Sequence, residues 1–261
     1  MEYGASFSGS AGGNFFVREN VEDCFRESSW KMAERGLPGR TYFVHLDPAT
    51  SSHNYALAVC HAEYFISKDT GKHDYIIFLD HMKYWQPMGA KTIDVDKVMQ
   101  YIIDLDRRFH IGLVTWDQWN SQDNIIALRN LGIPSKLNRF TFRFKNIIYD
   151  HLEKIVNNKK LIIYNDGRPD QQTDTQLLRM EMAFLQRRYI NNGYKVFPLT
   201  SGDTSTDDCV DALAAAVYNV INASMERLPQ GKLVNMTVSG GNNQVWRSMQ
   251  GVIGTGSGEQ V

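Results

Sequence analysis

Short apolar runs separated by turn-forming residues dominate the first half of the chain. Three of these runs, residues 41–46, 55–66 and 75–85, are rich in the Val, Ile, Tyr and Phe that favour β-strands. The connections between them are short and contain Pro, Gly, Ser and Asp, which are typical of turns. We therefore expect a meander of three antiparallel strands.

From Asp94 onward, the apolar residues change to a helical spacing. The period predicts a helix over 94–109, followed at once by a strand over 111–116. Further helices are expected over 121–130, 142–157, 175–190 and 206–223, and further strands over 161–164 and 194–199. Together the elements predict an α/β fold with a mixed sheet, in which three antiparallel strands are followed by parallel strands and helices cover both faces.

The two ends of the chain differ in composition from this middle. Residues 1–40 start with a Gly- and Ser-rich stretch and show only a weak helical pattern, over 21–34, before a break of Gly and Pro. The end of the chain is rich in Gly, Ser, Asn and Gln, which favour a flexible tail. We expect an N-terminal arm outside the core (1–40), one domain (41–225) and a flexible C-terminal tail (226–261).

Composition excludes several classes of protein. With 261 residues and 43% hydrophobic content, the chain can bury a full core. Its apolar runs are far shorter than the ~18 residues of a membrane span, and its start has no signal-peptide pattern. Cys24, Cys60 and Cys209 form no C-x-x-C pair, which argues against a disulfide framework or zinc site and indicates a reducing compartment. The chain also contains no G-x-x-x-x-G-K-[ST] phosphate loop.

Charge is unevenly distributed along the chain. Residues 129–195 contain thirteen Lys and Arg against six Asp and Glu, although the net charge of the whole chain is −1. Such a basic middle could bind a polyanion, with the acidic remainder holding metal ions that cut it. Arg139, Arg143 and Lys145 alternate with phenylalanines and form a candidate DNA-binding edge. The alternative is that these charges only solvate a helix face.

Aspartates lie where three of the predicted elements end or begin. Asp47 closes the first strand, Asp117 closes the strand 111–116, and Asp211 begins the last helix with Asp208 three residues earlier on the same face. Grouped carboxylates need a compensating positive charge, and all-oxygen ligands favour Mg²⁺ or Mn²⁺. We expect these four aspartates to bind two such ions, bridged by Asp47, for hydrolysis of a phosphodiester.

Each of these residues also fits a simpler role. Asp47 before Pro48 is a common turn pair, and Asp208 could cap the last helix. His45 lies on the same strand face as Asp47 and could assist proton transfer, or it could be a packed strand histidine. The metal site therefore rests on the conjunction of the aspartates more than on any one of them.

Three segments resemble the nuclease domain of viral DNA-packaging terminase large subunits. They are 42–49 (YFVHLDPA), 114–121 (VTWDQWNS) and 206–213 (TDDCVDAL), and the resemblance covers about 41–225. It implies a ribonuclease H-like fold and a metal-dependent endonuclease that cuts double-stranded DNA with little sequence specificity as concatemeric viral genomes are packaged. By this resemblance, Asp47, Asp117 and Asp211 would be catalytic metal ligands, with Asp208 as a further or supporting ligand.

The resemblance also implies partners and a location. Double-stranded DNA, the terminase motor domain, the small terminase and the portal would be its partners, in the cytoplasm of the host cell. Because only some 40 residues precede the matching segment, we expect the nuclease half without the ATP-driven motor.

Other functions share parts of this pattern. Ribonuclease H-like transposases and junction resolvases have the same layout of acids and would prefer branched DNA. An actin- or sugar-kinase-like ATPase also starts with a strand and an Asp, but we find no second phosphate loop. A non-catalytic DNA-binding or capsid-docking module would hold DNA without cutting it.

Overall fold

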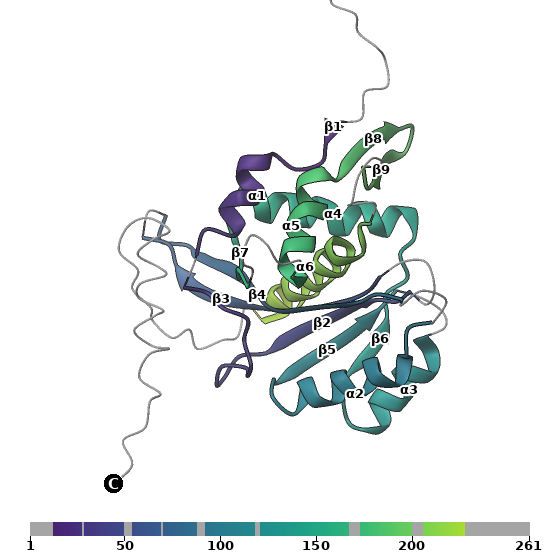
Figure 1. Cartoon of the computed structure of the whole chain (residues 1–261). Helices are drawn as coiled ribbons and strands as arrows, with labels where there is room; N and C mark the ends of the chain where they lie inside the picture. Colours follow the sequence, from purple (N-terminus) through teal and green to yellow (C-terminus); the bar gives the residue numbers. More distant parts are fainter. Residues whose placement is uncertain are drawn as a thin grey trace, which may run out of the picture.

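The fold is built around one six-stranded mixed sheet. The computed structural model describes residues 13–27, 29–49, 54–68, 70–87, 92–117, 121–166, 173–199 and 206–227. The strands of the main sheet are β2 (Tyr42–Asp47), β3 (Tyr55–Ile66), β4 (His73–Trp85), β5 (Ile111–Trp116), β6 (Ser135–Leu137) and β7 (Leu161–Ile163). Their order across the sheet is β6-β5-β2-β3-β4-β7 (Figure 1).

The pairing of the strands agrees with the predicted topology. Strands β2, β3 and β4 form the expected antiparallel meander. Strand β5 runs parallel to β2, β6 parallel to β5, and β7 parallel to β4. Because β2 and β5 are parallel neighbours, the carboxyl ends of both strands lie at the same edge of the sheet, where ligands of such sheets collect.

Helices cover both faces of the sheet, as predicted. On one side lie α2 (Val95–Asp106) and α3 (Gln122–Asn130); on the other lie α4 (Phe142–Asn157), α5 (Asp174–Phe184) and α6 (Asp208–Arg227) (Figure 1). Side chains alternate along β2, so that Val44 and Leu46 join the core under α2 while Phe43 joins the core under α6. No helix among the described residues is both long and apolar enough to cross a membrane.

The helix predicted over 175–190 is wrong in its second half. Helix α5 ends at Phe184, and Leu185 is already extended. Residues Gln186–Ile190 form β8, which turns through Asn191 and Asn192 into β9 (Gly193–Phe197) and pairs with it. Gly193 adopts a φ of 138°, a backbone conformation that residues other than glycine rarely adopt. Strand β9 therefore belongs to a small second sheet instead of extending the main one, and β6 was not predicted at all.

The described part of the N-terminal segment packs on the domain instead of lying outside the core. Its helix α1 (Arg18–Cys24) is shorter and earlier than the predicted one, and β1 (Gly13–Asn14) pairs with β8. Phe15, Phe16, Val21 and Trp30 are buried in the core under α6. The tail was predicted over 226–261, but residues 226 and 227 still belong to α6; residues 1–12 and those from 228 onward lie outside the described residues. Cys24, Cys60 and Cys209 are all buried and free.

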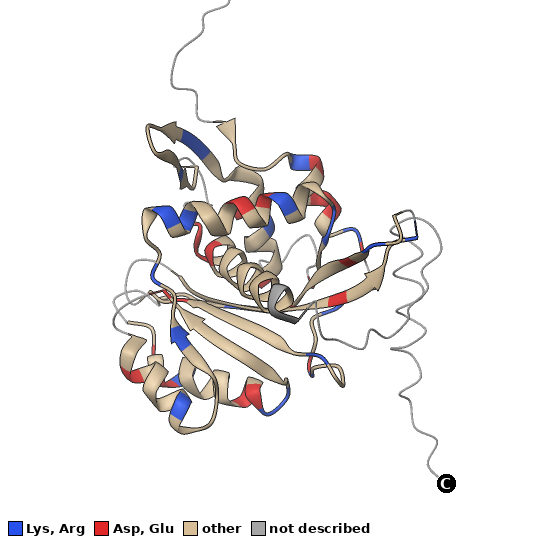
Figure 2. Ribbon diagram, turned by 180° about the vertical axis from the view of Figure 1, so that it is seen from behind, with Lys and Arg blue, Asp and Glu red and all other residues tan. Residues whose placement is uncertain are grey.

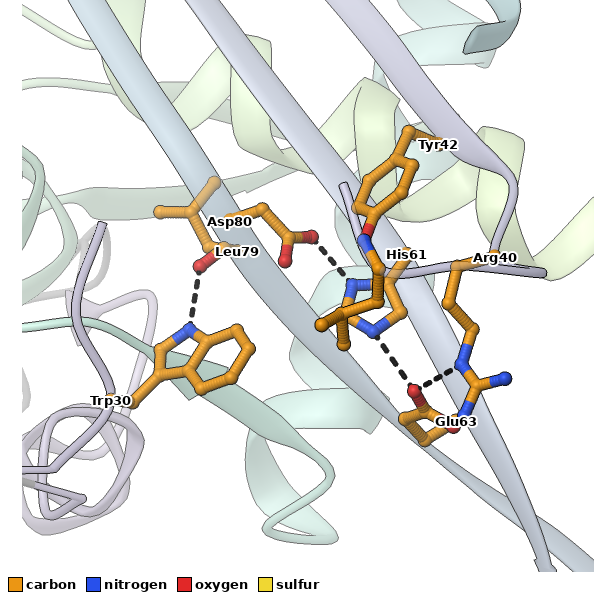
Figure 3. Close-up of polar contacts among 8 residues, drawn as sticks. Trp30, Arg40, Tyr42, His61, Glu63, Leu79 and Asp80 are labelled. Carbon is orange, nitrogen blue, oxygen red and sulfur yellow. Dashed lines mark hydrogen bonds and ion pairs between the residues drawn. The ribbon is translucent and has the colours of Figure 1, made fainter. Parts of the chain in front are cut away.

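A buried ionic network lies at the opposite end of β2 from Asp47. The His61 ring donates from Nδ1 to Asp80 at 2.6 Å, and its Nε2 lies 3.3 Å from the Glu63 carboxylate, which also pairs with Arg40 (Figure 3). Asp80 occupies a β-bulge between β3 and β4, which places an extra side chain inside. Burial opposes charge on His61, but Asp80 and Glu63 raise the pKa of His61 to about 9, so the imidazolium is the stable form. Trp30 covers this network and donates to Leu79 O at 3.0 Å (Figure 3).

Candidate active site

The four predicted aspartates approach one another at the carboxyl edge of the sheet. Helix α6 packs across β2 and β3, and its first turn carries Asp208 and Asp211. Burial, together with the charges of Asp211, Asp208 and Asp117, raises the pKa of Asp47 well above its ordinary value. Mutual repulsion of this kind requires proximity, so the fold brings the four side chains to one region.

Lys145 on α4 supplies positive charge to this region. Its Nζ lies 2.7 Å from the Asp211 carboxylate and 3.2 Å from that of Asp207. The Tyr149 hydroxyl donates to the other Asp211 oxygen at 2.5 Å. Burial nevertheless raises the pKa of Asp211 to about 7, with Lys145 and Tyr149 opposing that rise. One ammonium group therefore compensates the acidic cluster only in part.

Backbone donors orient two of the other aspartates. The Asn54 N–H, in the connection after β2, donates to Asp208 at 2.9 Å. The Phe140 N–H donates to Asp117 at 2.6 Å, although burial still raises the pKa of Asp117. For Asp47, no hydrogen-bond donor is found among the described residues. The carboxylate expected to bridge two ions is thus the one that the described protein groups stabilise least.

Glu181 is a fifth carboxylate that the sequence analysis missed. It is 2% exposed, accepts from Val210 N at 2.9 Å and from the Thr206 hydroxyl at 2.7 Å, and so fixes the start of α6. Burial raises the pKa of Glu181 to about 8. The sequence signal for it was its position among Leu177, Leu178 and Met182 on the apolar face of α5. A glutamate is rarely buried on such a face unless it has a bonding partner.

His45 has the packed role and not the proton-transfer role. The side chain is fully buried, its Nδ1 lies 2.7 Å from Thr115 Oγ1, and its ring stacks on Phe140 at 5.2 Å. Burial lowers the pKa of His45 to about 3. A ring that stays neutral at neutral pH and is closed off from solvent is poorly placed to exchange protons with a substrate.

The predicted DNA-binding edge divides into two parts. Arg139 and Arg143 are exposed near the start of α4, whereas Lys145 is turned into the carboxylates. Phe144 packs against Tyr218 on α6, with ring centroids 5.2 Å apart. Basic residues also lie on the β8–β9 hairpin, and acidic residues gather at the start of α6 (Figure 2).

The donor set suits a hard divalent cation by its chemistry. Among the described residues, no three carboxylate, His or Cys side chains are arranged as a metal-binding group as they stand. The converging groups are nevertheless all carboxylates, the ligands that Mg²⁺ and Mn²⁺ prefer. Burial, followed by the charges of neighbouring carboxylates, raises the pKa of Asp47 and Asp211, and a bound divalent ion would oppose that rise.

Comparison with known proteins gives a structural likeness only. No family model and no curated protein matches the sequence. The crystal structure of the HK97 bacteriophage large terminase is similar with a TM-score of 0.54 and 18% identity, over 80% of this chain and 44% of that chain. This chain therefore spans less than half the length of the HK97 protein.

Two solved nuclease structures match over almost their whole length. One is the large terminase nuclease from the thermophilic phage G20c with bound magnesium (TM-score 0.54, 14% identity, 80% of this chain and 98% of that chain). The other is the Thermus phage P74-26 large terminase nuclease domain (TM-score 0.53, 13% identity, 85% and 100%). At such low identity the likeness concerns the fold, and it confirms the predicted ribonuclease H-like mixed sheet. This chain has the fold of the phage large terminase nuclease domains.

Proposed function

We propose that this protein is a metal-dependent endonuclease that hydrolyses double-stranded DNA with little sequence specificity. The observation that carries the proposal is the approach of Asp47, Asp117, Asp208 and Asp211 to one another, where burial and the charges of the other three raise the pKa of Asp47. The fold supports it, because nuclease domains of large terminases share it. Cutting of concatemeric viral DNA during packaging is the proposed context.

The four aspartates have distinct proposed roles. Asp47, Asp117 and Asp211 would hold Mg²⁺ or Mn²⁺ as the catalytic ligands, with Asp208 as a further ligand. When bound, such ions activate the attacking water and stabilise the leaving 3′ oxygen. The Asn54 and Phe140 N–H groups orient Asp208 and Asp117, and this preorganisation lowers the cost of assembling the site.

Basic residues beside the carboxylates would bind the DNA. Arg139 and Arg143 are exposed on the connection into α4 and at its start, where they can contact phosphates. Lys145, the third predicted contact, lies against Asp211, so it would meet a phosphate only at the carboxylates themselves. In its present position it opposes the rise in the pKa of Asp211 that burial causes, because a nearby positive charge favours the charged carboxylate.

The larger assembly is also part of the proposal. We propose that the nuclease unit, with the described residues before position 41 packed on its core, works with a terminase motor domain, a small terminase and a portal in the cytoplasm of the host cell. The matching HK97 large terminase is a longer chain than this one.

Plasmid cleavage tests the proposal directly. We expect the unaltered protein to linearise and degrade supercoiled plasmid in Mg²⁺ or Mn²⁺ and to stop in EDTA. Asp47→Asn and Asp211→Asn should abolish cleavage with little change in the melting transition, because each removes a ligand and relieves repulsion. Asp123→Asn, at an exposed position of α3, is the matched control and should cut normally.

Other outcomes would point to other functions. Full cleavage by Asp47→Asn or Asp211→Asn would end the proposal. Strong preference for four-way junctions over linear duplex would favour a resolvase. DNA binding without cleavage in any metal would favour a non-catalytic module.

A further inference from the structure

Behind the carboxylates lies a buried polar junction that the proposed chemistry does not use. It joins His45 on β2, Thr115 on β5 and Asn219 on α6, whose side chains are at most 4% exposed. The Thr115 hydroxyl lies 2.7 Å from His45 Nδ1 and accepts from Asn219 Nδ2 at 2.7 Å. A fourth residue, Asn138, donates to Asn219 Oδ1 at 3.2 Å.

The junction joins the same three elements that carry the candidate ligands. His45 and Thr115 are directly paired in the parallel ladder of β2 and β5. Asp47 and Asp117 follow two residues later on the same side of each strand, roughly 7 Å further along. Asn219 lies about two turns after Asp211 on α6. The spacing of β2, β5 and α6 is thus determined by direct bonds next to the site.

The hydrogen-bond geometry favours a positioning role over simple packing. Thr115 Oγ1 also donates to Val44 O at 3.2 Å. With His45 Nδ1 and Asn219 Nδ2 as its other two partners, the hydroxyl makes the three hydrogen bonds of which it is capable. If that proton lies toward Val44, His45 donates from Nδ1 and its Nε2 is an acceptor. Nε2 is buried and has no partner among the described residues. A leucine or phenylalanine at position 45 would avoid the free-energy cost of burying Nε2 without a partner. The hydrogen bond at Nδ1 is therefore what a histidine adds at this position.

A second connection leads from the junction to Asp117. The His45 ring stacks on Phe140 with an interplanar angle of 7°. The Phe140 N–H is the group that holds the Asp117 carboxylate. Asn138 belongs to the same short connection between β6 and α4 as Phe140. The connection therefore contacts the junction twice, through the hydrogen bond of Asn138 to Asn219 and through the stacking of Phe140 on His45.

We propose that His45, Thr115, Asn219 and Asn138 form a positioning network that holds β2, β5 and α6 together, so that their aspartates stay close enough to close around divalent ions. This inference rests on the proposed function and deepens it. Its members are positioning residues, since none of them needs to touch the substrate or an ion. Loss of the network lowers metal affinity before it lowers the intrinsic reactivity of the loaded site.

Thr115→Val is the sharpest test, because it keeps the shape of the side chain and removes the central hydroxyl. We expect the Mn²⁺ concentration for half-maximal plasmid cleavage, and the dissociation constant of Mn²⁺ in calorimetry, to rise roughly 10-fold or more. Thr115→Ser keeps the hydroxyl and should restore both values. Asn138→Ala, at a half-buried position, should shift them in the same direction by less, and it serves if Thr115→Val does not fold.

Ser224→Ala is the matched control. Ser224 is buried on the same helix and bonded to Tyr64, but it lies at the far end of α6 from the aspartates. Its loss should lower the melting temperature without changing either Mn²⁺ value. An unchanged Mn²⁺ dependence in Thr115→Val, or an equal shift in Ser224→Ala, would overturn the inference while leaving the nuclease intact. If the unaltered protein neither bound Mn²⁺ nor cut plasmid, the proposed function would fail and the inference with it.

Discussion

The two ends of strand β2 both bury charged groups, yet they do so in opposite ways. At the start of the strand, Asp80 and Glu63 are matched by His61 and Arg40, two acids against two cations (Figure 3). At its end, four aspartates and the nearby Asp207 face Lys145. A balanced network can remain closed, whereas an unbalanced one needs an additional cation. Charge balance, more than burial, therefore distinguishes a structural ionic cluster from a candidate metal site.

Removing one acid from each end of β2 should show the difference between the two clusters most clearly, in stability and in cleavage. Asp80→Asn breaks a fully buried pair with His61 and should cost about 3–5 kcal/mol of unfolding free energy in urea, with cleavage per folded molecule retained. Asp211→Asn relieves repulsion, so it should leave stability nearly unchanged and abolish cleavage. Asp74→Asn, which breaks a partly exposed pair with Lys160, should cost ~1 kcal/mol or less. Equal destabilisation by Asp80→Asn and Asp211→Asn would refute the contrast.

The pH dependence of stability in EDTA should show both ends in separate windows. The pKa of Asp211 is raised from 3.8 to about 7, so the folded state holds that proton more tightly and stability falls as the pH rises from about 4 to 7. The pKa of His61 is raised from 6.5 to about 9, so its contribution is complete below pH 6.5 and is lost as the pH rises through 9.

Denaturation of Asp211→Asn across this pH range provides the measurement. The decline between pH 4 and 7 should shrink, and the alkaline decline, on the order of 3 kcal/mol, should remain. Glu181 titrates in both proteins, so the difference between them reports Asp211 together with Asp47, whose pKa the charge of Asp211 raises. Loss of the alkaline decline in this variant would show that the two ends are not independent.

Divalent ions should stabilise only one end. Mn²⁺ at 100 times its dissociation constant should add about 2.7 kcal/mol to the unfolding free energy, because it binds the folded state. Asp47→Asn should lose this gain, and Asp80→Asn should keep it although its starting stability is lower. Thermal melts with and without Mn²⁺ measure the effect. An equal gain in Asp47→Asn would place the ion elsewhere.

The smallest effect concerns Lys145, the cation that pairs with Asp211 and Asp207. Lys145→Met should cost ~2 kcal/mol in EDTA, the size expected for hydrogen bonds to charged groups, because Asp211 and Asp207 lose their partner. In saturating Mn²⁺ the cost should be smaller, since the ion would compensate the same carboxylates. Lys160→Met, which breaks the partly exposed pair with Asp74, is the control and should give equal, small costs with and without Mn²⁺. A cost for Lys145→Met that does not depend on metal would contradict this interpretation.

Local sequence patterns were sufficient to predict those elements whose structure depends on residues close together in the sequence. The alternating and continuous apolar runs predicted β2, β3, β4 and β5, because a strand that lies in a core must present apolar side chains there. The three-residue spacing of Asp208 and Asp211 placed both on one side of α6. The sequence predicted a strand over 111–116 after the meander, and the structure pairs it parallel to β2, which brings Asp47 and Asp117 to one edge.

Other features depended on contacts that no local pattern contains. Residues 186–190 have helix-compatible side chains, yet pairing with β9 and β1 makes them a strand, because ladder hydrogen bonds outweigh small differences in propensity. Lys145 was expected on DNA but meets Asp211, 66 residues away in sequence. The His61–Asp80 pair likewise depends on a bulge that turns an extra residue inward.

The sequence by itself determined which carboxylates lie at the ends of which elements, because hydrophobic periodicity depends only on residues that are near one another along the chain. Only the tertiary structure decided how each charge is compensated, because electrostatic energy depends on distance through space and on burial. That is why Asp47 could be predicted as a ligand, while the bonds of Glu181 to the start of α6 and the junction of His45, Thr115 and Asn219 became visible only in the folded chain.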